Sequence, residues 1–180
     1  MNQEVEIKVI AKNQKKAEEI IKKKAKFVKE REQIDEYFVP DNNDFFKEKN
    51  TKEYLRVRNE TGKNKICYHY CHFDKNGFLL KTDEYESNVE DPKMVSEILK
   101  KLKMTNKVTV KKHRKYYEYK DFEILIDNIK GLGTFIEVEA RVVEDLEKTR
   151  KSCYDILDEL GIEWKKAPEM GYPDMLLEKE

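Results

Sequence analysis

The segment KVTVKKHRKYYEYKDFEILIDNIKGLGTFIEVEARV, residues 107–142, carries the clearest structural signal in this chain. Polar and apolar side chains alternate along it in three runs, which predict β-strands near 107–119, 121–128 and 134–142. Strands joined by such short connections pair in the antiparallel sense. The segment therefore predicts one block of an antiparallel sheet.

A second block of strands precedes this segment. Alternation predicts further strands at 3–10, 27–38, 53–60, 65–74 and 78–88. Apolar residues at helical spacing predict helices at 13–24, 92–103 and 145–160. This order of elements favours a single domain of the α+β class, residues 1–180, built as an antiparallel sheet or barrel.

The chain is rich in charge but carries none overall. Charged residues make up 41% of it and hydrophobic residues 38%, and 37 Lys and Arg balance 37 Asp and Glu. This balance argues against a nucleic-acid-binding protein, which would present a basic face. No run reaches the roughly 18 apolar residues of a membrane span, and the N-terminus lacks the apolar region of a signal peptide. We expect a cytoplasmic protein with no membrane partner and with three reduced cysteines.

Arginine is concentrated on alternating strand faces. Three of the six arginines, Arg56, Arg58 and Arg114, lie on predicted polar strand faces. In a chain so rich in lysine, a face that merely contacts water would carry lysine more often. The planar guanidinium fork, by contrast, suits phosphate oxygens. The pattern therefore indicates phosphate binding.

Carboxylates alternate in the same way along other strands. The pairs are Glu4 and Glu6, Glu123 and Asp127, and Glu137 and Glu139. Carboxylates two residues apart on a strand, as in the first and last of these pairs, point the same way at about 6 to 7 Å. If these charged strand faces point into a barrel, the interior cannot be a packed core, because isolated buried charges cost too much free energy. It can be a wet tunnel for a polyanion, in which carboxylates hold Mg²⁺ or Mn²⁺.

The strand Glu4-Val5-Glu6-Ile7-Lys8 and several later segments resemble one known family. The later segments, in order, are QIDEYFVPDNNDF, YLRVR, VTVKKHRKYY, LIDNIKGLGTFIEVEA and GYPDMLLEK. Together they are similar to the motifs of the CYTH superfamily of triphosphate tunnel metalloenzymes, and they span nearly the whole chain. This superfamily includes class IV, CyaB-like adenylyl cyclases and thiamine triphosphatases, and the GLGTFIEVE stretch resembles the CyaB-like branch.

The resemblance implies an eight-stranded antiparallel barrel that forms a tunnel flanked by helices. It implies ligands for Mg²⁺ or Mn²⁺ at Glu4, Glu6, Asp127, Glu137 and Glu139. It implies triphosphate-binding residues at Lys8, Arg56, Arg58, Lys112 and Arg114, and a further tunnel carboxylate at Glu84. Within these sets, Lys8, Asp127 and Arg114 are the candidate catalytic residues.

Two departures from the family pattern fall in the middle of the chain. His69 stands where relatives commonly have Lys, and Thr82 stands where Arg is common. Each removes a positive charge, for which Lys65, in phase with His69, is a candidate replacement in triphosphate binding. Cys67, His69 and Cys71 share one strand face and could ligate zinc. Structural zinc sites usually have four ligands at turns, so we interpret these cysteines as small packing residues.

Function follows from the resemblance as a set of alternatives. The first is a class IV adenylyl cyclase that converts ATP to 3′,5′-cyclic AMP and pyrophosphate. The second is a triphosphatase acting on thiamine triphosphate, a nucleoside triphosphate or inorganic tripolyphosphate. The third is a non-catalytic polyphosphate- or nucleotide-binding module. Exposed aromatic residues in the stretch Tyr116 to Tyr119 could additionally serve a homodimer.

Overall fold

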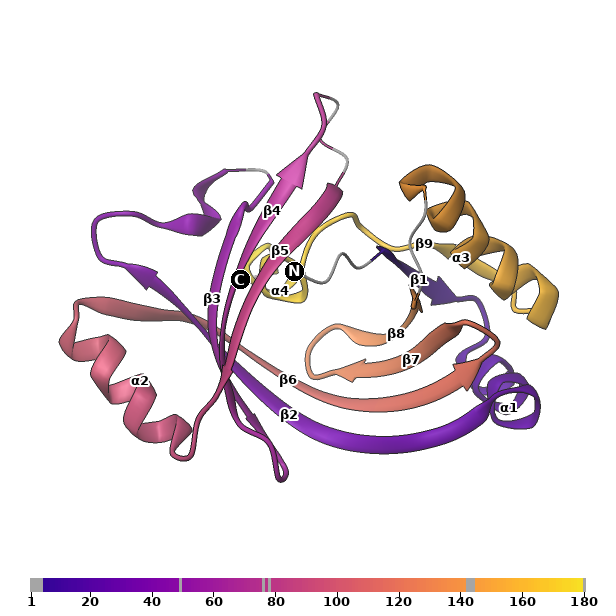
Figure 1. Ribbon diagram of the computed structural model, residues 1–180, viewed down its shortest axis with the longest axis horizontal. Coiled ribbons are helices and arrows are strands. Elements are labelled where there is room, and N and C mark those ends of the chain that lie inside the picture. The colour runs from indigo at the N-terminus through magenta and orange to yellow at the C-terminus, as the bar shows by residue number, and fades with distance from the viewer. Residues whose placement is uncertain (1–4, 49, 76, 78, 142–144, 180) are drawn as a thin grey trace.

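A computed structural model describes residues 5–48, 50–75, 77, 79–141 and 145–179 (Figure 1). In this part of the chain the strands are β1 (Val5–Ala11), β2 (Lys26–Pro40), β3 (Glu53–Glu60), β4 (Lys65–Phe73), β5 (Leu79–Asn88), β6 (Met104–Tyr119), β7 (Phe122–Ile129), β8 (Gly133–Ala140) and β9 (Trp164–Lys166). The helices are α1 (Gln14–Lys24), α2 (Pro92–Lys101), α3 (Leu146–Leu160), α4 (Tyr172–Leu177) and the 3₁₀ turn η1 (Phe45–Lys47). The predicted strands and helices are confirmed, whereas β9 and α4 were not predicted.

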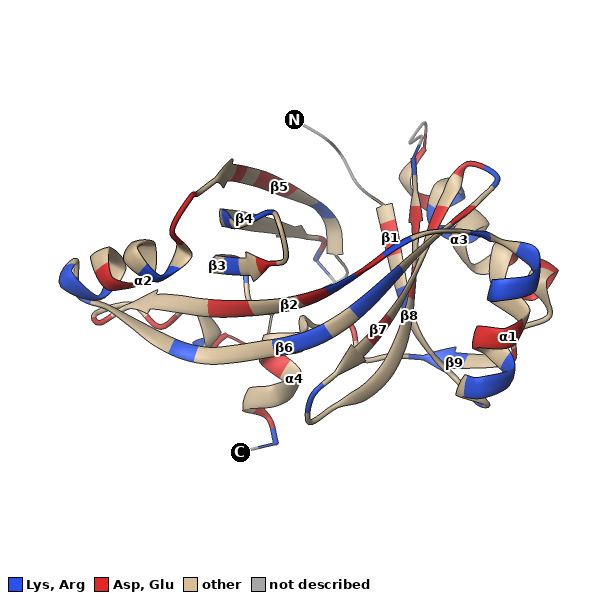
Figure 2. Cartoon of the chain, turned by 90° about the horizontal axis from the view of Figure 1, so that it is seen from below, with Lys and Arg blue, Asp and Glu red and all other residues tan. Residues whose placement is uncertain are grey.

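The strands form one antiparallel sheet in the order β5-β4-β3-β2-β6-β7-β8-β1-β9. The long strands β2 and β6 pair along most of their length, with register irregularities at Phe27/Lys29 and Tyr37/Phe38. Such irregularities bend a strand pair. The bend separates two wings, which we call the β3–β5 wing (β3, β4 and β5) and the β7–β1 wing (β7, β8 and β1) (Figures 1 and 2).

The sheet is open, which corrects the expected eight-stranded closed barrel. Its two edges are β5 and β9, and the described residues show no pairing of β5 with β1 or β9. Three residues of β9 pair with the outer edge of β1, with Val9 opposite Lys166 and Ala11 opposite Trp164. Because β9 occupies that edge, this part of β1 is unavailable to β5.

Apolar side chains on the outside of the β7–β1 wing form the largest core. It joins Ile21 of α1 and Leu157 of α3 to strand residues Val9, Ile124 and Val138, all fully buried. Each such side chain contributes about 1.5–3 kcal/mol through burial. Since successive strand residues point to opposite faces, burying these residues against the helices leaves their polar neighbours on the concave face.

The β3–β5 wing has a much smaller core under α2. Phe38, Val57 and Leu99 are its buried residues. On the opposite side of α2, Ile98 is 50% exposed and Leu102 is 68% exposed. The two wings are therefore covered to very different degrees.

Local capping explains where the long helices begin and end. Asn13, Asp91 and Asp145 each accept a hydrogen bond from the backbone N–H three residues further on, which starts α1, α2 and α3. Gly161, with φ of 79°, ends α3 in the left-handed conformation that glycine favours. Among the described helices, none combines the length and the hydropathy that crossing a membrane requires.

The aromatic stretch on β6 differs from the expectation of exposed rings. Tyr117 is 1% exposed and lies in the core with α1 and α3. Tyr119 is half-buried and donates a hydrogen bond to Glu159 of α3 at 2.7 Å. Tyr117 and Tyr119 therefore pack against helices of their own chain.

Candidate functional site

The concave face of the sheet gathers most of the predicted site residues. On the β7–β1 wing, Arg114 lies directly opposite Asp127, and Lys8 lies directly opposite Glu137. On the other wing, Arg58 lies opposite Lys65. Figure 2 shows the same arrangement as blue and red bands on neighbouring strands. The alternation read from the sequence thus places these side chains on one surface.

Arg114 is held by two buried carboxylates. Its Nε donates to Asp127 Oδ1 at 2.6 Å, and its Nη2 donates to Asp127 Oδ2 and to Glu137. Asp127 is fully buried and Glu137 is 5% exposed. Burial alone would raise the pKa of Asp127, but Arg114 and Lys112 lower it below its ordinary value. Asp127 therefore stays ionised and fixes the direction of the guanidinium fork.

A second carboxylate clamp holds Arg58. Asp35 accepts hydrogen bonds from Arg58 Nε and Nη2, both at 2.7 Å, and Arg56 Nη1 lies 3.9 Å from the same carboxylate. Burial opposes ionisation of Asp35, yet the two arginines hold its pKa well below its usual range. The sequence analysis did not select Asp35. The available signal was its place in QIDEYF, where Gln33, Asp35 and Tyr37 alternate on one face.

Lys8 and Lys112 flank the ring of Tyr172 from α4. Their Nζ atoms lie 4.7 and 5.6 Å from the ring centroid, within the range of cation–π attraction. Lys8 Nζ also donates to the backbone carbonyl of Met170. Burial lowers the pKa of Lys8, and burial together with the Arg114 charge lowers the pKa of Lys112 to about 8. The C-terminal segment is therefore part of this site.

Carboxylates on three adjacent strands form a row beside these cations. Glu6 of β1 lies opposite Glu139 of β8, which lies opposite Glu123 of β7. Directly opposed residues in a sheet have Cβ atoms about 4.5–5.5 Å apart. Carboxylates that project side by side from such positions offer the hard oxygen ligands that Mg²⁺ and Mn²⁺ prefer. The predicted ligand Glu4 lies outside the described residues.

The β3–β5 wing carries a different charged group. Glu86 forms an ion pair with Lys65, and its Oε1 lies 3.7 Å from Arg56 Nη2. His69 lies between two carboxylates, with Nδ1 3.5 Å from Glu84 and Nε2 3.7 Å from Glu86. His69 and Lys65 lower the pKa of Glu86, against the effect of burial. Lys65 and Glu84 thus reach the concave face as expected, together with Glu86, which the sequence analysis did not select.

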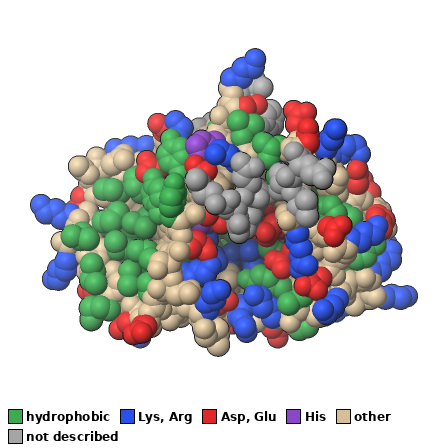
Figure 3. Space-filling model, in the orientation of Figure 1, with side chains coloured by type: hydrophobic (Ala, Val, Ile, Leu, Met, Phe, Trp, Pro, Cys, Tyr) green, Lys and Arg blue, Asp and Glu red, His purple; other side chains and the backbone are tan. Residues whose placement is uncertain are grey.

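These groups lie deep in the molecule rather than on its rim. Arg56, Arg58 and Arg114 have side chains only 15%, 11% and 14% exposed, and Lys112 is 6% exposed. Figure 3 shows charged side chains around the hollow at the centre of the molecule. Water screens charges poorly at such depth, so an anion that entered would meet strong attraction.

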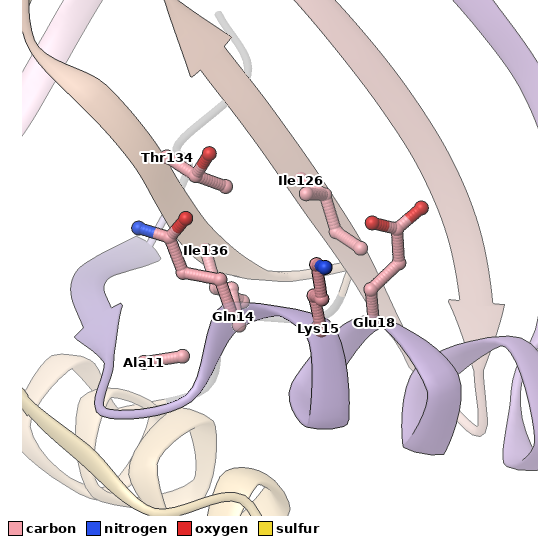
Figure 4. Close-up of a pocket in the computed structure, with 7 residues that line it drawn as sticks. All are labelled: Ala11, Gln14, Lys15, Glu18, Ile126, Thr134 and Ile136. Atoms are coloured by element: carbon pink, nitrogen blue, oxygen red, sulfur yellow. The ribbon is translucent and has the colours of Figure 1, made fainter.

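A pocket between α1 and the strands β7 and β8 is separate from this surface (Figure 4). Ile126 and Ile136 line it together with Glu18. In each strand the neighbouring residue, Asp127 or Glu137, points to the opposite, concave face. Glu18 is also engaged in ion pairs with Lys22 and Lys115, so the pocket adds no group to the charged site.

Comparisons with known proteins agree with this architecture. The model of the CYTH domain family matches residues 2–169. The protein "Putative adenylate cyclase MJ0240" from Methanocaldococcus jannaschii is 35% identical over 163 residues, which cover 88% of this chain and 90% of that protein. The solved structure of the PH1819 protein from Pyrococcus horikoshii OT3 matches 98% of this chain and 99% of its own, with a TM-score of 0.82 and 28% identity.

A second solved structure, that of the PH1012 protein from the same organism, covers 95% of this chain and 98% of its own. Its TM-score is 0.78, at 26% identity. The family match extends over nearly the whole chain, and it agrees with the order of motifs and with the clustering of their charged residues on one face. This protein belongs to the CYTH domain family.

Proposed function

We propose that this protein is a divalent-metal-dependent enzyme that acts on a triphosphate bound on the concave face of the sheet. The observation that carries this proposal is the pair of buried arginine clamps, Asp35 with Arg58 and Asp127 with Arg114. Each clamp orients a guanidinium fork before any ligand arrives. Cations fixed in this way lose little conformational freedom on binding an anion.

The cations form a path long enough for several phosphate groups. It runs from Arg56 and Arg58 on β3, through Lys112 and Arg114 on β6, to Lys8 on β1. Neighbouring strands are about 4.8 Å apart, so the path crosses much of the width of the sheet. A linear polyphosphate can follow it, with Nη1 of Arg58 and Arg114 donating to nonbridging oxygens while Nε and Nη2 stay on the carboxylates.

The carboxylate row would hold the divalent cation. Glu6, Glu123 and Glu139 supply hard oxygen ligands that lie opposite one another on three adjacent strands, and Asp127 and Glu137 hold Arg114. A bound cation would supply further positive charge to phosphate oxygens during the reaction. We therefore place the metal nearest Glu6 and Glu139 and assign Asp127 and Glu137 the positioning of Arg114.

The first candidate reaction is adenylyl cyclisation. The ribose 3′ hydroxyl loses its proton to solvent and its oxygen attacks the α-phosphorus of ATP. The bond between the α-phosphorus and the oxygen that bridges it to the β-phosphorus breaks, and pyrophosphate leaves. Arg114 and Lys8 would stabilise the negative charge that develops on the leaving group. The name of the 35%-identical relative from M. jannaschii supports this choice.

Hydrolysis of a triphosphate is the second candidate. The observation that favours it is the character of the concave face, where charged side chains extend from β4 to β1. Such a surface recognises the phosphate chain rather than a base. The nucleophile would then be water in place of the ribose oxygen.

Product analysis distinguishes these reactions. Purified protein is incubated with ATP, thiamine triphosphate or tripolyphosphate in the presence of Mg²⁺ or Mn²⁺, and the products are separated. Cyclic AMP with pyrophosphate supports the cyclase. Orthophosphate without cyclic AMP contradicts the cyclase and supports the triphosphatase, and tight binding without turnover contradicts both and indicates a binding module.

A matched pair of variants ties any activity to this surface. Arg58→Lys keeps the charge but removes the fork that Asp35 orients, and we expect kcat/KM to fall about tenfold or more. Arg150→Lys is the control, because Arg150 lies on α3, is 32% exposed and pairs with Glu169 at 2.9 Å. Equal activities of the two variants would contradict the placement of the substrate.

A further inference from the structure

We propose a second metal site, for a zinc-like ion that prefers thiolate and imidazole, formed by Cys67, His69 and Glu86 on β4 and β5. One ligand atom from each of these residues lies within 4.8 Å of the others. In a tetrahedral zinc site with bonds of about 2.0 to 2.3 Å, ligand atoms are roughly 3.3 to 3.8 Å apart. Small side-chain rotations would therefore close the three groups around an ion.

The backbone sets up this cluster. Cys67 lies directly opposite Glu86 in the pairing of β4 with β5, and His69 follows Cys67 by two residues on the same face. All three side chains therefore converge on the concave side of a hydrogen-bonded strand pair. Sites built on paired strands hold their ligands more precisely than loops do.

His69 supplies an independent observation. Its Nε2 atom is buried, has no hydrogen-bond partner among the described residues, and lies 3.7 Å from Glu86 Oε1. A buried polar nitrogen without a partner costs free energy, and coordination of an ion would remove that cost. Nδ1 of the same ring lies 3.5 Å from Glu84 Oε1. A carboxylate behind a metal-binding histidine is the usual support that orients its ring.

The present partners of Glu86 define what an ion must displace. Lys65 forms an ion pair with Glu86, and Arg56 Nη2 lies 3.7 Å away. The lysine stem is flexible and can return its ammonium group to water. Three protein ligands then leave a fourth position open, which is the arrangement that catalytic rather than structural zinc sites have.

The structure replaces the ligand set considered from sequence alone. Cys71 shares the strand face with Cys67 and His69, but its Sγ lies 3.7 Å from Thr82 Oγ1 and outside the cluster. Glu86, from the neighbouring strand, takes its place. Cys153 is buried on α3, far along the chain. These two cysteines provide matched controls for the thiol at position 67.

Metal titration of the full chain tests the proposal without any nucleotide. Protein freed of metal with a chelator is titrated with Zn²⁺ by calorimetry and with Co²⁺ by absorption spectroscopy. With Mg²⁺ in excess to occupy the carboxylate row, we expect one equivalent of Zn²⁺ to bind, and a thiolate-to-cobalt charge-transfer band to appear in the near ultraviolet. A cobalt complex without that band would overturn the site.

Three variants locate the ligands. Cys67→Ser and His69→Gln should each weaken Zn²⁺ binding by about 100-fold or more, since loss of even an outer-shell partner typically costs 10- to 100-fold. Cys71→Ser should bind within about twofold of the unchanged chain, because its sulfur lies outside the cluster. Circular dichroism checks that each variant is folded. If Cys67→Ser does not fold, His69→Gln tests the site in its place. Equal loss in Cys71→Ser, or unchanged binding in His69→Gln, would refute the proposal.

Discussion

The two wings of the sheet present charge to the same concave face, but they differ in how they are supported. The β7–β1 wing rests on the large core under α1 and α3, and its Arg114 is clamped by Asp127 and Glu137. The β3–β5 wing rests on three buried residues under α2. Its Glu86 is 26% exposed and is shared by lysine, arginine and histidine. The β7–β1 wing therefore holds its charged side chains in a fixed geometry, whereas the charged side chains of the β3–β5 wing can exchange ion-pair partners.

Removing the Arg114 guanidinium should have the largest effect on the free energy of unfolding. Arg114→Ala leaves Asp127 and Glu137 buried without their partner, and breaking such a buried ion pair costs about 3–5 kcal/mol. Urea unfolding should show a correspondingly lower free energy of unfolding. Lys65→Ala removes a cation from the other wing, where Glu86 keeps other partners, and should cost much less. Equal losses would mean that the wings do not differ in support.

Truncation of apolar residues tests the two cores directly. Leu157→Ala opens a cavity in the large core, and Leu99→Ala does so in the small one, where the side chain is 8% exposed. We expect losses of about 4 and about 2 kcal/mol, within the range for buried leucine. The measurement is again urea unfolding. A larger loss of stability in Leu99→Ala than in Leu157→Ala would contradict the conclusion that the β7–β1 wing has the stronger core.

Neutralising the carboxylate row should weaken the response to metal. Glu6→Gln removes one ligand charge opposite Glu139, and the Mg²⁺ concentration for half-maximal activity should rise about tenfold. Glu19→Gln, on the exposed face of α1, is the control and should leave that concentration unchanged. An unchanged metal response in Glu6→Gln would remove this residue from the metal site.

The lowered pKa of Lys112 predicts a pH dependence. Its ammonium form is lost as pH rises through about 8, so affinity for tripolyphosphate should fall above that pH. Stability changes in the opposite direction. Because the pKa is 10.5 in the unfolded chain, that chain binds more protons between about pH 8 and 10.5, and the stability contribution of this group rises with pH across this window.

Lys112→Met is the variant that checks this assignment. It should bind tripolyphosphate more weakly at pH 7 and lose the decline in affinity centred near pH 8. Calorimetric titration at a series of pH values measures both. If the affinity of Lys112→Met still declined near pH 8, the titrating group would be a residue other than Lys112.

The smallest effect is expected from adding a positive charge to the β3–β5 wing. Thr82 lies on the concave face of β5, and Thr82→Arg should lower KM for the triphosphate about threefold at low salt. The gain should disappear near 0.5 M salt, which shortens the screening length to roughly 4 Å. Thr82→Met is the uncharged control of similar reach. A gain in the Met variant would show that size, not charge, is responsible.

The local pattern of residues was sufficient to predict much of this structure. Strict alternation assigns each strand residue to one of two faces, which is why Lys112, Arg114 and Asp127 were placed together correctly from the sequence. Capping residues such as Asn13 and Gly161 likewise act within one turn of chain. These features depend on neighbours in sequence, so they can be predicted from the local pattern of residues.

Other features depend on contacts between distant parts of the chain, and they become recognisable only in the folded molecule. Asp35 is recognisable as a clamp only once β3 brings Arg58 opposite it, and Glu86 joins Cys67 only through the pairing of β4 with β5. Three residues of β9 on the edge of β1 are too few for a periodic signal, yet they help to keep the sheet open. Alternation specifies the face of a side chain, whereas pairing and register decide what it meets there.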